Sequence, residues 1–202
     1  MKPDAELTQM GTALLLSSDA DGARKSQQLH YRIEHVRALS LVFHAERPNA
    51  FWAMQIDDAV RGATGPIVVV AHGACCLAFA HWAQLSPASY TAPIAGAVLH
   101  LPSAIIASPP PGVPASSPRM RLPFPSLLVS DASPQVDAVL AQADVWGSRF
   151  IDAAAHDSVY RSDLRGNASY AERALMTVLL GRIDPSESDR QHPRWPQRSR
   201  AS

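Results

Sequence analysis

Apolar residues gather in short runs along this chain, separated by longer stretches in which apolar and polar residues mix. The run at residues 67–71 is apolar at consecutive positions, which is typical of a strand covered on both faces. Similar runs with strand character lie at residues 12–16, 39–43, 96–101 and 126–129, and residues 149–152 form a sixth candidate.

Between these runs the apolar residues recur at helical spacing. Trp52, Ile56 and Val60 draw one apolar stripe along a helix over residues 52–60. Because strands that alternate with helices favour parallel βαβ units, we predict a three-layer α/β/α sandwich. Its sheet is mainly parallel, with about five or six strands and helices on both faces. Further helices are predicted at residues 77–85, 136–146 and 170–180.

Two segments have irregular composition. Residues 108–114 read Ser-Pro-Pro-Pro-Gly-Val-Pro and predict a surface loop. From Asp184 onward the chain is rich in Pro, Ser and Arg, so we predict a single domain at 1–183 and a disordered tail at 184–202. The tail arginines offer contacts to an acidic partner, but a solvated tail without one is the favoured interpretation.

Composition narrows the possible environments and partners. With 202 residues, 47% of them apolar and 18% charged, the chain has the makeup of one globular domain. Its formal net charge is zero, which predicts no nucleic-acid and no membrane partner. The start of the chain is acidic and polar, unlike a signal peptide, and no apolar run approaches the about 20 residues of a bilayer span. Adjacent Cys75 and Cys76 would close no useful disulfide loop, so we expect a reduced, cytoplasmic protein.

One segment carries the candidate chemistry. Residues 65–83 lead from an apolar strand through small residues directly into an apolar helix. In hydrolases this strand–turn–helix is the nucleophile elbow, written G-x-S-x-G. The sharp turn lifts the serine above the sheet, and the amide after it stabilises an oxyanion at the helix N-terminus.

This segment resembles the elbow of the small serine hydrolases grouped with retinoblastoma-binding protein nine and the bacterial YdeN proteins. Their elbow typically reads V-x-H-S-L-G-C-L-A-x-A-H-W-A, and residues 70–83 read V-A-H-G-A-C-C-L-A-F-A-H-W-A in the same register. Downstream, residues 95–99 resemble the next strand of the family, and residues 121–129 resemble its R-x-P-F-P-S-x-x-V run.

Upstream, Pro48 and Trp52 fall where the family opens a helix with a Pro and a Trp. The resemblance covers about residues 12–181. It implies an α/β-hydrolase fold and an esterase- or amidase-like activity with a Ser-Asp-His triad. We expect no cofactor and no metal.

Within this register the triad of the family is altered. Gly73 stands at the nucleophile position and Ser133 at the position of the acid. Asp131 lies in the same loop, two positions earlier, and His156 follows the last strand as the family histidine does. The resemblance therefore implies a degenerate triad of which His156 and Asp131 are the remnants. A loop histidine without a catalytic role is the alternative for His156.

The resemblance also places an oxyanion site or ligand pocket around the elbow. Ala74 supplies the amide that follows the nucleophile position, and Cys75 replaces the second elbow glycine. Ser17 and Ser18 stand where the family has a glycine-rich loop after the first strand.

The same residues allow other interpretations. A cysteine at a helix N-terminus can act as a nucleophile, but Cys76 matches a cysteine that active family members also carry, which indicates packing. A metal site built from His72, Cys75, Cys76 and His81 is disfavoured because adjacent helical cysteines point in different directions. Trp82 and Trp146 are expected in the core.

Our leading hypothesis is a pseudoenzyme, a non-catalytic binding or regulatory relative that takes a small-molecule ligand or a protein partner. The alternative is a weak esterase or amidase that uses a cysteine or a water molecule held by His156. A diverged protein with a purely structural role is a third possibility.

Overall fold

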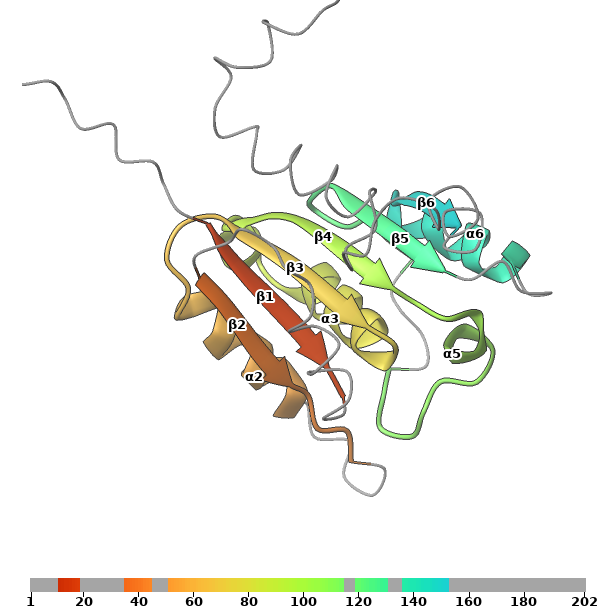
Figure 1. The fold of residues 1–202 in the computed structure, drawn as a ribbon, viewed down its shortest axis with the longest axis horizontal. Helices are drawn as coiled ribbons and strands as arrows, with labels where there is room; N and C mark the ends of the chain where they lie inside the picture. The colour runs from red at the N-terminus through yellow and green to blue at the C-terminus, as the bar shows by residue number, and fades with distance from the viewer. Residues whose placement is uncertain (1–10, 19–34, 45–50, 115–118, 131–135, 153–202) are drawn as a thin grey trace, which may run out of the picture.

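The computed structural model of the chain describes residues 11–18, 35–44, 51–114, 119–130 and 136–152. These residues form one six-stranded sheet whose neighbouring strands all pair in parallel, in the order β2-β1-β3-β4-β5-β6 (Figure 1). This arrangement confirms the parallel α/β sheet predicted from the sequence. The strands are β1 (Thr12–Ser17), β2 (His35–Ser40), β3 (Ile67–His72), β4 (Ile94–His100), β5 (Ser126–Ser130) and β6 (Arg149–Asp152).

The central strand β3 is buried on both faces, as its continuous apolar run predicted. Val69 and Ala71 belong to the large core cluster on the helical side of the sheet. Val70 belongs to a smaller cluster on the other face, with residues of β1, β4 and β5. Residues of one strand thus alternate between two buried environments, which explains why this strand lacks an alternating polar pattern.

The predicted strand at residues 39–43 was wrong in position, because β2 spans His35–Ser40. β2 is an edge of the described sheet, and its Val36 is 48% exposed. The apolar residues that suggested the strand come after it: Leu41 is buried and Phe43 packs against the core. An edge strand needs less apolar surface than the segment that leads from it into the core.

The helices match the predicted apolar stripes. α2 and α3 lie behind the sheet on the same face (Figure 1), and their buried residues share one core cluster with those of α6. Trp82 and Trp146 are buried in this cluster, as expected. α3 begins three residues before the predicted helix at 77–85, and residues 108–114 contain no helix or strand. The helices are α2 (Phe51–Arg61), α3 (Ala74–Leu85), α4 (Ala88–Thr91), α5 (Ser103–Ala107) and α6 (Val136–Trp146).

Two predicted features, the helix at 170–180 and the tail at 184–202, lie outside the described residues. Within the described part, none of the helices combines the length and the apolar character needed to cross a bilayer.

The strand order locates a binding position before any side chain is considered. From β1 the chain moves to β2 on one side, whereas β3 leads to β4, β5 and β6 on the other side. The connections that leave β1 and β3 therefore diverge. In open parallel α/β sheets, ligands bind at the carboxyl ends of the strands beside such a switch point. Here those ends are Ser17 of β1 and His72 of β3, next to Gly73.

Candidate functional site at the turn after β3

Gly73 forms the turn between β3 and α3. Its φ of 59° and ψ of −128° lie in a region that residues with a side chain rarely adopt. The Gly73 N–H donates to the His100 carbonyl at 2.8 Å, and the Cys76 N–H donates to the Gly73 carbonyl at 3.1 Å. The N–H and the carbonyl of Gly73 are thus both hydrogen-bonded, one to β4 and the other to the first turn of α3. These two bonds hold the sharp conformation of the turn.

Among the described residues, the space in front of Gly73 is open. Apart from Gly73 itself and its two chain neighbours, none of them has an atom within 4 Å of a β-carbon built on its backbone. A β-carbon at this position would therefore meet no other described residue, and the positive φ is what opposes it.

The beginning of α3 presents backbone donors to this space. Ala74 and Cys75 are its first two residues, and the first N–H groups of a helix have no partner within the helix. Together with the helix dipole, these amides favour a negative or strongly polar group nearby. Gly73 is the residue that caps α3, and it has no side chain that could accept a hydrogen bond from these amides.

Cys76 faces the interior behind the turn. Its thiol lies 3.2 Å from the Ala71 carbonyl and 3.3 Å from the His100 carbonyl, and its single S–H can donate to either oxygen. Burial raises the pKa of the Cys76 thiol well above its ordinary value, and the neighbouring Cys75 adds to the effect. A buried thiol that stays protonated is a poor nucleophile, and Cys75 is also fully buried. These contacts disfavour cysteine-based catalysis.

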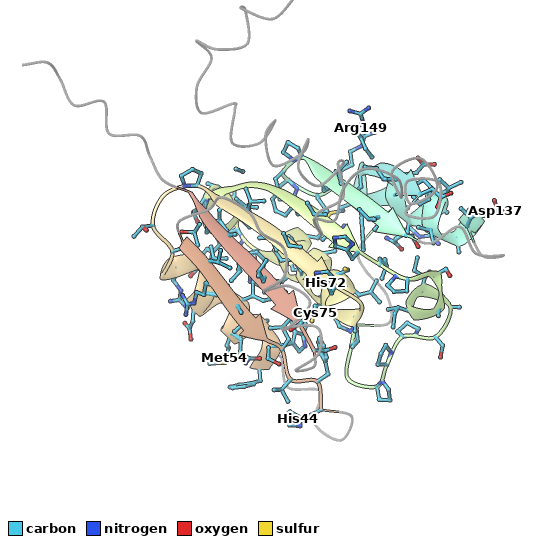
Figure 2. All side chains as sticks on the ribbon, viewed as in Figure 1. His44, Met54, His72, Cys75, Asp137 and Arg149 are labelled. Atoms are coloured by element: carbon cyan, nitrogen blue, oxygen red, sulfur yellow. The ribbon has the colours of Figure 1, made fainter. Side chains whose placement is uncertain are left out.

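His100 is a residue of this site that the sequence interpretation missed. Its ring stacks on that of His72, with centroids 4.5 Å apart and planes 7° from parallel. The two histidines are register partners at the carboxyl ends of β3 and β4. Each histidine is the last residue of its strand. Aligning the carboxyl ends of the two predicted strands would have indicated that the two side chains are neighbours. Figure 2 shows His72 and Cys75 near each other where β3 passes into α3.

Comparison with known proteins identifies the family. A family model described as serine hydrolase matches residues 22–159. The chain belongs to the serine hydrolase family. Its fold is similar to a crystal structure described as a YdeN-like hydrolase from Pectobacterium atrosepticum, with a TM-score of 0.55 and 18% identity over 72% of this chain and 78% of that chain. No curated protein sequence gave a match. These findings confirm the predicted α/β-hydrolase fold and the predicted membership of the serine hydrolase family.

The structure brings together part of the site predicted for this member of the serine hydrolase family. Ser17 is buried at the carboxyl end of β1, and Ser18 follows it on the surface. β1 pairs directly with β3, so Ser17 lies at the same edge of the sheet as Gly73.

The remaining predicted site residues, His156, Asp131 and Ser133, lie outside the described residues. No three His, Cys, Asp or Glu side chains gather into a possible metal site within the part of the chain that the structure describes.

Proposed function

We propose that this member of the serine hydrolase family is a non-catalytic binding or regulatory protein. The observation that carries the proposal is Gly73, which occupies the strand-to-helix turn and has no side chain. Acyl transfer by a serine hydrolase needs a hydroxyl within hydrogen-bond reach of a base, and a glycine supplies none. Ser133 at the position of the acid points in the same direction.

The ligand in this proposal occupies the space in front of Gly73. Three features support that location: the switch point between β1 and β3, the space that the described residues leave at Gly73, and the positive end of the α3 dipole. A small molecule or an inserted side chain of a protein partner with a polar or anionic group suits this end of the helix.

The alternative proposal is a weak esterase or amidase. Of its two versions, the cysteine nucleophile is disfavoured by the burial of Cys75 and Cys76. Activation of a water molecule by His156 is the version that an experiment has to exclude.

Hydrolysis of a short-chain aryl ester by the purified protein separates the two proposals. A binding protein should give no turnover above the buffer rate, and His156→Ala and Cys75→Ala/Cys76→Ala should not change that result. Turnover in the native chain that is lost in either variant would establish a rebuilt catalytic site and overturn the proposal.

A further inference from the structure

A separate cavity lies between α2, the C-terminal half of α3 and α4. Its volume is about 400 Å³, within the range of about 300–1,000 Å³ typical of small-molecule sites. His81, one of its lining residues, follows Gly73 by eight positions, which corresponds to about 12 Å along the helix. The cavity is therefore distinct from the turn at Gly73. It is lined by Trp52, Ala53, Asp57, His81, Trp82, Leu85, Ser86, Pro87 and Tyr90.

The cavity walls are mainly apolar and aromatic. The side chains of Trp52 and Trp82 form the buried part of the cavity wall, whereas those of Leu85 and Tyr90 are 62% and 36% exposed. Large apolar groups exposed beside a concavity favour the binding of an apolar ligand body.

Asp57 is the single carboxylate among the lining residues. Its Oδ1 accepts a hydrogen bond of 2.7 Å from the indole N–H of Trp82, which fixes the orientation of the carboxylate. No described residue donates to its Oδ2. A carboxylate held in this way among aromatic walls is complementary to an organic cation.

Arg61 lies beside the cavity but does not neutralise the carboxylate of Asp57. The Arg61 guanidinium lies 6.0 Å from the centre of the Tyr90 ring, but its ion pair, at 3.2 Å, is with Asp58 on the solvent side. Arg61 reaches only the backbone carbonyl of Asp57, at 3.4 Å.

His81 adds a polar atom to the same wall. Its ring meets Trp52 edge to face at 6.1 Å. The His81 Nδ1 is buried, and no described residue forms a hydrogen bond with it. Buried polar atoms of this kind are commonly satisfied by a bound ligand or an ordered water molecule.

We propose that this cavity binds a small organic ammonium ion. The ammonium group donates to the free oxygen of Asp57, and the apolar body of the ligand lies between Trp52 and Tyr90. This site goes beyond the proposed function at Gly73 and does not depend on it.

The first test compares two probes of the same shape and different charge. Benzylamine, protonated at neutral pH, is titrated into the full chain beside neutral benzyl alcohol, and binding is followed by calorimetry and by the NMR signal of the Trp82 indole N–H. The amine should bind saturably and at least about tenfold more tightly than the alcohol, because only the amine makes a charge-assisted hydrogen bond. Equal affinity of the two probes would overturn the proposal. So would the absence of saturable binding of benzylamine, phenethylamine and cyclohexylmethylamine below about 10 mM.

Two matched variants locate the site. Asp57→Asn removes the charge but keeps an oxygen that can accept from Trp82, and it should weaken benzylamine binding at least about tenfold. Asp58→Asn removes the same charge from a side chain that is 72% exposed on the same helix, and it should change the affinity by less than about twofold. Equal weakening by both variants would contradict a specific site.

Two further variants keep the test independent of folding and of the elbow. Tyr90→Leu removes one aromatic wall at a half-exposed position and should also weaken amine binding while the alcohol is little affected. Gly73→Ser should leave amine binding unchanged, so that failure of this proposal is distinguishable from failure of the proposed function.

Discussion

Gly73 and Gly112 are both glycines with a positive φ, of 59° and 81°, yet their surroundings differ completely. A β-carbon at Gly112 would lie 2.7 Å from the backbone carbonyl oxygen of His44, whereas one at Gly73 would meet no described atom within 4 Å beyond its chain neighbours. Gly112 is therefore required by both backbone conformation and space. Among the described residues, nothing but the backbone conformation requires Gly73, and the position of a β-carbon there is open.

The contact at Gly112 also explains how the region around Gly73 is framed. His44, labelled in Figure 2, follows β2, and Gly112 lies in the loop that follows β4 and α5. β1 and β3 lie between β2 and β4 in the sheet. The loops from the two flanking strands thus meet beyond the carboxyl ends of β1 and β3, beside the proposed ligand position.

The largest expected effect is a difference between these two glycines. Gly112→Ala should lower the free energy of unfolding by about 3–5 kcal/mol, because a strained φ and a clash with backbone act together. Gly73→Ala should lower it by about 1–3 kcal/mol, because only the strained φ acts. Urea denaturation of both variants measures the two values.

Gly147→Ala serves as the control for positive φ beside a flexible neighbour. A β-carbon at Gly147, with a φ of 67°, would lie nearest to the side chain of Arg121, at 3.3 Å. Gly147→Ala should lower the free energy of unfolding by about as much as Gly73→Ala does. A loss for Gly73→Ala as large as that for Gly112→Ala would show that the space in front of Gly73 is filled.

The sequence was sufficient where burial alone determines structure. β1, β3, β4 and β5 are nearly continuous apolar runs because both faces of each strand are covered, and their positions were predicted to within one or two residues. β2 was misplaced because an edge strand carries mixed residues while the apolar Leu41 follows it.

The candidate site was predicted only as far as local sequence allows. The small residues around Gly73 indicated a tight turn, and the structure has one. The stacking of His100 on His72 depends on the register of two strands. The hydrogen bond between Trp82 and Asp57 joins two helices, and the two residues are 25 positions apart in sequence. Neither follows from a local pattern.

A smaller effect should come from Cys76, on the packed inner side of the same turn. Burial raises the pKa of its thiol in the folded protein above the about 8.5 of an exposed cysteine. Below about pH 8.5 the thiol is protonated in both states, and its full contribution to stability is present. Above that pH the unfolded chain releases the proton and the folded chain does not, so stability should fall by up to about 1.4 kcal/mol per pH unit.

The effect is measured as a difference between the native chain and Cys76→Ala, because tyrosines and lysines also titrate in alkaline solution. Between about pH 8 and pH 10 the native protein should lose more stability than the variant does. Parallel curves would mean that the thiol ionises as easily in the folded state as in the unfolded state, and the inner side of the turn would then be open as well.

We propose that this member of the serine hydrolase family has the turn and the space for a nucleophile but lacks the nucleophile itself. Labelling with a fluorophosphonate, detected by intact mass, tests it most directly in the native chain and in Gly73→Ser/Ser133→Asp. We expect an adduct on the variant, at residue 73, with loss of fluoride, and no adduct on the native chain. An adduct on the native chain would contradict it.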